Sequence, residues 1–234
     1  MNIGIIGAMI EEVEFFLESI EDLKEVKNGN TLFYTGTWHE HHVTICKCGV
    51  GKVNAAMTAQ LLIDKYEVET IIFTGVAGAL DQKLNIQDVV ISTSCQEHDI
   101  DASPLGFPRG TIPMYDGTSD FPADKKLIDT AYIAANEIVP NHIQVWKGKI
   151  VSGDQFIANR EEVNQLKDLF SAICVEMEGA AVAHVANFNH IPYVVLRSIS
   201  DKANGEAPNS FETFVKNAAK TSAEIVERIV VLLK

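Results

Sequence analysis

Residues 172–188 read AICVEMEGAAVAHVANF, an apolar run followed by an alanine-rich segment, with two glutamates at the junction. The run 172–176 has the length and composition of a buried strand, whereas residues 178–188 have the apolar spacing of a helix. Charged side chains are rarely buried without a partner, so Glu176 and Glu178 need a reason to lie there. This unit of strand, polar junction and helix is the pattern from which the rest of the fold is predicted.

The same alternation of apolar runs and helical patterns extends along the chain. We expect strands at residues 3–8, 32–38, 42–48, 70–75, 88–93, 145–152, 172–176 and 192–200. We expect helices at residues 11–20, 53–65, 124–138, 160–169, 178–188 and 210–233. Continuous apolar strands separated by helices are typical of a mostly parallel sheet covered on both faces. The sequence therefore predicts one α/β domain over residues 1–234, with three layers and a central mixed, largely parallel sheet flanked by helices.

Composition and charge restrict the classes of partner. The chain has 234 residues, 47% of them hydrophobic, and a formal net charge of −13 that is spread along its length. An acidic surface repels phosphate backbones and anionic lipids, so we expect neither nucleic acid nor a membrane as partner. The first residues, MNIGIIGAM, lack the basic segment and cleavage site of a signal peptide, so we expect a cytoplasmic protein. The four cysteines fit neither a zinc site nor a disulfide framework, and we expect free, mostly buried thiols.

Every unusual polar or glycine-rich cluster follows a predicted strand. These clusters are at residues 8–12, 75–78, 152–156, 176–178 and 200–201. In open α/β sheets, ligands bind outside the carboxyl ends of the strands. If the strands are parallel, the five clusters converge on one pocket that holds several carboxylates. Neighbouring carboxylates shift one another's pKa values, which separates acid from base roles.

Other candidate motifs point to no additional site. GVGKVN (49–54) lacks the glycine and the Ser/Thr of a P-loop, and it also lacks the last glycine of a dinucleotide fingerprint. The histidine-rich tip at residues 39–42 is expected to be a solvated hairpin, and no metal site is predicted. We expect His98 to be a loop histidine with ordinary hydrogen bonds and His184 to be a satisfied core histidine.

Four segments together resemble a known family. GIIGAMIEEV (4–13), SGDQFI (152–157), VEMEGAAVAHV (175–185) and RSISDKAN (197–204) resemble the 5′-methylthioadenosine/S-adenosylhomocysteine nucleosidases of the purine nucleoside phosphorylase superfamily. The resemblance covers essentially the whole chain, in order. It implies a nucleoside phosphorylase-like fold and hydrolysis of the N9–C1′ bond of adenine nucleosides that carry a 5′-thioether, without cofactor or metal. It also implies a role in methionine salvage.

The resemblance assigns roles to individual residues. It implies that Asp201 is the general acid at adenine N7 and that Glu12 activates the attacking water. Glu178 would hold the ribose hydroxyls, with Met177 packed against the sugar. The remaining substrate-binding residues implied by the resemblance, or expected from close backbone approach to a ligand, are Met9, Val50, Ala77, Gly78, Phe156, Ile157, Arg197, Ser200 and Phe211.

Within that set, Phe156 would stack on adenine, the Ile157 backbone would recognise its edge, and Ser200 and Arg197 would orient the acid and the water. Met9, Val50 and Phe211 would line the sugar and the 5′ side. Glu176 is assigned to contacts near its own junction.

Three departures from the family's pattern affect these expectations. Val76 occupies a position that is often serine, so the water network differs, and Ile10 occupies one that is often glutamate. The loop 99–113 differs from common members, which leaves open the preferred 5′ group, including 5′-deoxyadenosine and 6-amino-6-deoxyfutalosine. The resemblance also implies a homodimer in which a loop near Pro113 completes the partner's pocket.

Two rival functions remain open at this point. A phosphorylase of the same superfamily would use phosphate in place of water; it would need cationic groups there, whereas Glu12 repels an anion. A catalytically silent nucleoside-binding protein on the same fold is the other rival, since a fold alone does not imply function. The joint presence of Glu12, Glu178 and Asp201 favours a hydrolase over both.

Overall fold

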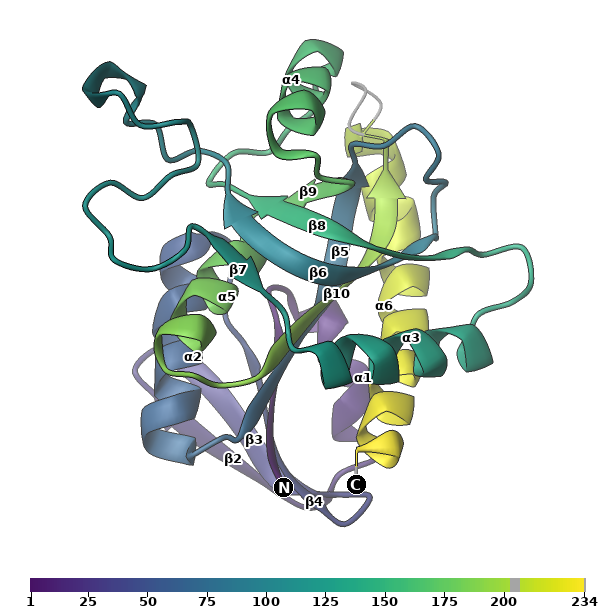
Figure 1. Ribbon diagram of the computed structural model, residues 1–234. Helices are drawn as coiled ribbons and strands as arrows, with labels where there is room; N and C mark the ends of the chain where they lie inside the picture. The colour runs from purple at the N-terminus through teal and green to yellow at the C-terminus, as the bar shows by residue number, and fades with distance from the viewer. Residues whose placement is uncertain (203–206, 234) are drawn as a thin grey trace.

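One mixed sheet forms the centre of the computed structural model (Figure 1), which describes the backbone of residues 1–202 and 207–233 and the side chains of residues 1–202 and 218–233. The strands are β1 (Asn2–Gly7), β2 (Glu21–Asn28), β3 (Thr31–Trp38), β4 (His41–Lys47), β5 (Thr70–Ala79), β6 (Val89–Glu97), β7 (Asp120–Pro122), β8 (Val145–Ser152), β9 (Cys174–Glu176) and β10 (Tyr193–Asp201). The helices are η1 (Ile10–Glu12), α1 (Glu14–Leu17), α2 (Lys52–Tyr66), η2 (Ser103–Leu105), α3 (Lys125–Ile138), α4 (Arg160–Phe170), α5 (Gly179–Phe188) and α6 (Ala207–Leu232).

Helices cover both faces of this sheet and make the predicted three layers. Helices α2 and α5 pack on one face, and α1, α3 and α6 pack on the other (Figure 1). Alanines 180, 181, 183 and 186 of α5 are buried, and small side chains let α2 approach closely. On the opposite face the core is built from Ile225, Val226, Ile229 and Val230 of α6 against the alanines of α3. All nine residues of β10 are buried, as expected for a strand covered on both faces.

The order of the strands is β2-β3-β4-β1-β5, and β5 together with the four strands β9, β8, β6 and β10 closes into a ring. Strand β5 pairs with both β10 and β9, and the ring continues from β10 through β6 and β8 back to β9. The pairings of β1 with β4 and β5, and of β5 with β10, are parallel. Strands β6, β8 and β9 are parallel to one another, whereas β9 is antiparallel to β5. The sheet is therefore mixed, and its second half is a small closed barrel.

The barrel changes how the polar clusters meet. They were expected to converge because every strand would run the same way. In the structure the end of β9 reaches the end of β5 through an antiparallel pairing, with Gly78 opposite Val175. Residues 75–78 lie inside β5 and do not follow it. Convergence of the clusters is confirmed, but closure of the barrel produces it and not parallel strands alone.

One local prediction is wrong, and two strands were not predicted. The helix expected at residues 11–20 is only the single turn η1 and the four-residue α1, because the Glu12 side chain bonds back to the Ala8 and Met9 amides and turns the chain. Strand β2 was not predicted, since its charged sequence EDLKEVKN has no apolar alternation. The three-residue β7 was also missed within a stretch rich in proline and glycine.

Candidate active site

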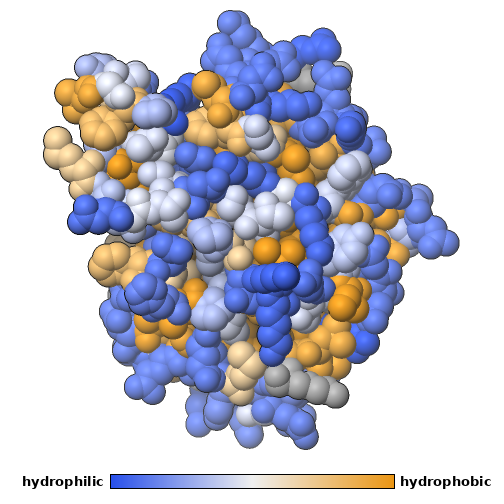
Figure 2. All heavy atoms as spheres, in the orientation of Figure 1, coloured by the Kyte–Doolittle hydropathy of each residue, from blue (hydrophilic) through white to orange (hydrophobic). Residues whose placement is uncertain are grey.

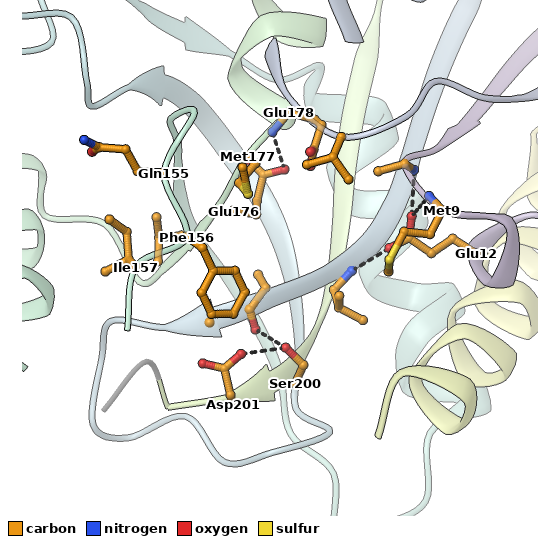
Figure 3. A pocket seen from close by; sticks show the side chains of 16 residues that line it. Met9, Glu12, Gln155, Phe156, Ile157, Glu176, Met177, Glu178, Ser200 and Asp201 are labelled. Atoms are coloured by element: carbon orange, nitrogen blue, oxygen red, sulfur yellow. Dashed lines mark hydrogen bonds between the residues drawn. The ribbon is translucent and has the colours of Figure 1, made fainter. Parts of the chain in front are cut away.

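A cavity of about 280 Å³ opens where β1, β5, β8, β9 and β10 end (Figure 3). Its lining combines four carboxylates with apolar side chains. The residues are Ala8, Met9, Glu12, Val50, Val76, Ala77, Gly78, Gln155, Phe156, Ile157, Val175, Glu176, Met177, Glu178, Ser200 and Asp201. A concave, mostly apolar pocket with a few convergent polar groups is the usual form of a small-molecule site.

Glu12 enters the cavity from the turn after β1. Its Oε2 accepts hydrogen bonds from the amides of Ala8 at 2.6 Å and Met9 at 2.9 Å, and its Oε1 accepts one from the Val76 amide at 3.3 Å. Burial raises the pKa of Glu12, although the positive charge of Arg197 and the three amides oppose the shift. The carboxylate is thus fixed in position and made more basic, which is what a general base needs.

Two glycines make room for Glu12. A Cβ on Gly75 would lie 2.7 Å from Glu12 Oε1 and 3.1 Å from an Arg197 nitrogen. A Cβ on Gly7 would lie 2.9 Å from the Glu12 Cβ. The glycines at the end of β1 and inside β5 therefore have a steric role at this site, because any larger residue would displace the Glu12 side chain.

Glu176 holds the start of α5 and pairs with a buried arginine. It accepts hydrogen bonds from the amides of Glu178 and Gly179 and from the Ser152 hydroxyl. Its Oε2 lies 2.5 Å from Nη2 of Arg197, which is fully buried and stacks over the Phe73 ring. The assignment of Glu176 to contacts at its own junction is confirmed. An anion at a helix N-terminus is also favoured by the helix dipole.

We expect Arg197→Met to lower the free energy of unfolding at pH 7 by about 3 kcal/mol, because removing one partner leaves the buried Glu176 carboxylate uncompensated. Urea unfolding measures this difference. Arg228→Met is the matched control, since Arg228 also lies 2.5 Å from a glutamate, Glu137, but both side chains are partly exposed. The control should lower the free energy of unfolding much less, because solvent screens an exposed ion pair. Equal costs for the two variants would contradict a special role for burial.

Glu178 is the second carboxylate of the opening junction, and it faces the cavity. Its Oε1 accepts a hydrogen bond of 2.8 Å from the Gly51 amide at the start of α2. Burial, and then the negative charge of Glu176, raise the pKa of Glu178 to about 7. The two glutamates therefore differ in role: Glu176 is neutralised within the protein, whereas Glu178 is free to meet a ligand.

A pH dependence of stability follows from this shift. Glu178 binds a proton more tightly in the folded protein than in the unfolded chain, so its contribution to stability falls as the pH rises from 4.5 towards about 7. Glu178→Gln removes this loss. We expect the variant to gain stability relative to the parent by an amount on the order of 1–3 kcal/mol across that window. Urea midpoints measured from pH 4.5 to 8 test this. Parallel curves for the two proteins would contradict it.

Asp201 is the last residue of β10 and reaches the cavity through an irregularity in the strand. The register with β5 shifts between Ile199 and Asp201, so that Asp201 lies opposite Gly78. Such bulges commonly re-aim a side chain beside an active site. The Ser200 hydroxyl lies 2.8 Å from Asp201 Oδ2 and 3.3 Å from the carbonyl oxygen of Ala77 (Figure 3). Ser200 thus links the acid to the backbone of β5.

The loop after β8 forms an apolar wall beside Asp201. Phe156 is 54% exposed and its ring lies over the cavity near Ser200 and Asp201, whereas Ile157 is buried in a small core with α4 (Figure 3). Helix α4 anchors this loop, because Asn159 caps it and Val163, Leu166 and Phe170 bury one face. Met177 lines the same cavity from the junction between β9 and α5. A half-exposed aromatic ring beside a carboxyl group is suited to stacking on a planar heteroaromatic ring of a ligand.

Most of the predicted site residues meet in this cavity. Glu12, Asp201, Met9, Val50, Ala77, Gly78, Phe156, Ile157, Met177, Glu178 and Ser200 all line it. Arg197 lies behind Glu176 and does not line it. The side chain of Phe211 lies outside the described residues, as do the backbone of residues 203–206 and all side chains of the segment 203–212. Val175, which also lines the cavity, lies outside the predicted clusters, whereas Ala8 and Gln155 belong to the clusters at 8–12 and 152–156 but have no predicted role of their own.

The histidines and cysteines outside the cavity form no metal cluster among the described residues. His39 pairs with Glu227 of α6, and His184 stacks on Phe121. The four cysteines are free and buried, as predicted. Within the described part of the chain, no helix is both long and apolar enough to span a membrane.

Comparison with known proteins identifies the family of the chain. The model of the phosphorylase superfamily matches residues 2–231. A 5′-methylthioadenosine/S-adenosylhomocysteine nucleosidase of Staphylococcus aureus (strain JH9) is 42% identical over 229 residues, which are 97% of this chain and 98% of that protein.

Solved structures extend the comparison to three dimensions. The corresponding nucleosidase from S. pneumoniae with the transition-state inhibitor MT-ImmA has a TM-score of 0.91 and 32% identity over 100% of both chains. The futalosine hydrolase of Helicobacter pylori strain 26695 has a TM-score of 0.93 and 37% identity, over 100% of this chain and 98% of that one. Because the match in sequence and in fold extends over almost the full length, the chain belongs to the phosphorylase superfamily and, within it, to the 5′-methylthioadenosine/S-adenosylhomocysteine nucleosidases.

Proposed function

We propose that the chain hydrolyses the N-glycosidic bond of 5′-methylthioadenosine and S-adenosylhomocysteine, releasing adenine and the thioribose product. The observation that carries this proposal is that Glu12, Glu178 and Asp201 line one cavity from three different elements. Cleavage of the bond leaves negative charge on adenine and positive charge on the sugar. Inverting glycoside hydrolysis requires two carboxyl groups. One is a general acid beside the leaving group, here adenine, and the other is a general base beside the attacking water.

Asp201 is proposed to protonate adenine N7 and Glu12 to deprotonate the attacking water. The hydrogen bonds at Glu12 indicate which of its oxygens takes the proton. Two amides occupy Oε2, whereas Oε1 accepts only the longer bond from Val76. Oε1 is therefore the proposed proton acceptor. Phe156 stacks on the adenine in this scheme, and the Ile157 backbone meets its edge.

Glu178 is proposed to hold the ribose. The Gly51 amide occupies its Oε1, which leaves Oε2 for the sugar hydroxyls. Met177, Met9 and Val50 provide apolar surface for the sugar and the 5′ group. The scheme requires neither a cofactor nor a metal, because the two charges that develop in the reaction both meet carboxyl groups.

The charge of the cavity favours water over phosphate as the nucleophile. Among the described residues that line it, four are carboxylates and none is lysine or arginine. Arg197, the nearby cation, is already paired with Glu176. A phosphate dianion would meet repulsion with no free cation to offset it, whereas neutral water would not.

Incubation with 5′-methylthioadenosine in phosphate-free buffer tests the proposal, with adenine and methylthioribose measured as products. Release of both without phosphate supports hydrolysis. Release only after phosphate is added would make the chain a phosphorylase and overturn the role of Glu12. Binding of the nucleoside without release under either condition would indicate a silent binding protein.

The identity of the 5′ group and the cellular role are finer parts of the same proposal. We propose 5′-thioethers as the main substrates, with 5′-deoxyadenosine as a further one, and methionine salvage in the cytoplasm as the setting. A neighbour in fold is a futalosine hydrolase, so 6-amino-6-deoxyfutalosine is the competing substrate to compare. Values of kcat/KM measured side by side for 5′-methylthioadenosine, S-adenosylhomocysteine, 5′-deoxyadenosine and 6-amino-6-deoxyfutalosine would rank these substrates.

A homodimer is also proposed, with the arm at residues 98–119 as the contact. This arm extends away from the sheet in Figure 1, and Figure 2 shows apolar side chains gathered in the same area. Within it, Leu105 is 69% exposed and Met114, next to Pro113, is 90% exposed. Exposed apolar side chains of this size favour a protein partner. Light scattering coupled to size exclusion measures the mass in solution, and a monomer would contradict the proposal.

A further inference from the structure

A closed ring of hydrogen bonds, formed by residues adjacent in sequence to the cavity lining, joins three segments that are far apart in the sequence. Lys52 Nζ donates to Asp99 Oδ1 at 2.6 Å. The Asp154 amide donates to the other oxygen of Asp99 at 2.9 Å. The Lys52 amide donates to Asp154 Oδ1 at 2.8 Å. The ring therefore fastens the start of α2, the segment after β6 and the loop after β8 to one another.

Residues adjacent to the ring in the sequence connect it to the cavity at two places. The amide of Gly51, one residue before Lys52, donates to Glu178. Residues 155–157, which directly follow Asp154, form the apolar wall on the base side. None of Lys52, Asp99 and Asp154 lines the cavity itself. The ring thus connects the carboxylate proposed for the ribose with the loop proposed for the adenine.

Two members of the ring, Lys52 and Asp99, are shielded from solvent, whereas Asp154 is exposed. The side chains of Lys52 and Asp99 are each only 17% exposed, so the pair is less screened than a surface ion pair. Burial alone would raise the pKa of Asp99, but the hydrogen bonds from Lys52 and the Asp154 amide outweigh it and hold that pKa below its usual range. Asp99 therefore stays charged in the ring.

Close packing on either side leaves the ring little freedom to adjust. Gly51 has a φ of +98°, and a Cβ there would lie 3.1 Å from Asp154 Oδ1. On the other side, the His98 ring is completely buried against Gly153, whose Cβ would lie 2.4 Å from the ring. Neither ring nitrogen of His98 has a hydrogen-bond partner among the described residues, which corrects the expectation of an ordinary loop histidine.

We propose that Lys52 and Asp99 are positioning residues. They hold the Gly51 amide against Glu178, at the sugar subsite, and they hold the loop 155–157 at the adenine subsite, so that the two subsites keep a fixed relative position. This inference rests on the proposed function for its kinetic readout. It assigns to the GVGKVN turn a purpose other than phosphate binding. Misplacement of a site by even 1 Å from outside the chemistry costs up to about 10²-fold in rate.

The variants Lys52→Met and Asp99→Asn, and the double variant, test the proposal on the full-length protein. We expect each single variant to lower kcat/KM for 5′-methylthioadenosine by about 10- to 100-fold, with a raised KM. The kcat/KM of the double variant should be no lower than that of the less active single variant, because either substitution alone already breaks the ring. Lys52→Arg, which keeps a cation in reach of Asp99, should recover part of the loss.

Lys149→Met is the matched control, since Lys149 forms an ion pair of the same 2.6 Å length with Asp120 and does not line the cavity. Its kcat/KM should stay close to that of the parent protein. A loss in the control equal to that of Lys52→Met, or additive losses in the double variant, would overturn the proposal.

Hydrogen exchange gives a readout that does not depend on turnover. In Lys52→Met, amide exchange should accelerate together at residues 50–54 and 154–157, whereas Lys149→Met should leave both segments unchanged. Acceleration confined to residues 50–54 would overturn the coupling even if the enzyme is active. If the parent protein releases no adenine, the proposed function fails, and the exchange result still decides whether the ring links the two segments.

Discussion

Asp201→Asn should lower the rate of adenine release by about 10²–10⁴-fold, the usual contribution of a general acid. Asparagine has nearly the same size and keeps an oxygen for the Ser200 hydroxyl, which lies 2.8 Å from the carboxylate. It has no acidic proton to give to adenine N7, so the leaving group would depart as an anion. Binding should change far less than turnover. Single-turnover rates measured beside the dissociation constant of 5′-methylthioadenosine separate the two effects.

A change of leaving group makes this test specific for the acid. A 5′-methylthioriboside that carries p-nitrophenolate needs little protonation to depart, so its hydrolysis should be much less sensitive to Asp201→Asn than that of the adenine nucleoside. Asp81→Asn is the control, because Asp81 follows β5 but does not line the cavity. Near-normal adenine release by Asp201→Asn would contradict the role of Asp201 as the acid.

The sequence predicts most of the regular elements because their burial is uniform. Strand β10 is buried at every position and α5 is largely alanine and valine, so apolar pattern alone identifies both. Strand β2 is exposed at nearly every position, and its sequence carries no such pattern. Strand β2 forms because it pairs with the edge of β3, and this tertiary pairing leaves no mark on the local sequence. The antiparallel return of β9 onto β5, which closes the barrel, is likewise invisible to local reasoning.

Residues that line the cavity could be predicted from the sequence where one motif contains several of them, but not where packing decides which side chain faces the cavity. Glu176 and Glu178 look alike in sequence, two residues apart, and their tertiary contacts distinguish them, above all the pairing of Glu176 with the buried Arg197. Arg197 itself was expected beside the substrate, but the structure has it behind Glu176. The ring of Lys52, Asp99 and Asp154 joins residues up to 102 positions apart, and no spacing rule indicates it.

Glu12→Gln should abolish most of the activity and leave the protein at least as stable. Glutamine keeps the shape of the side chain, and its oxygen can still accept the Ala8 and Met9 amides. Its NH₂ group would then take the place of Oε1, the proposed proton acceptor, and would face the Val76 amide as a second donor. The variant therefore has no group that removes a proton from water. We expect a rate loss of about 10²–10⁴-fold, measured as adenine release.

The effect on stability makes this variant a test of mechanism rather than of folding. Burial raises the pKa of Glu12, which means that the ionised side chain costs stability near neutral pH. A neutral glutamine removes this cost, so the melting temperature should hold or rise while activity falls, as is common where function requires a strained or charged site. Glu14→Gln, at an exposed position in α1, should change neither quantity. A fall in activity matched by a fall in melting temperature would instead mean that Glu12 acts by holding the turn after β1.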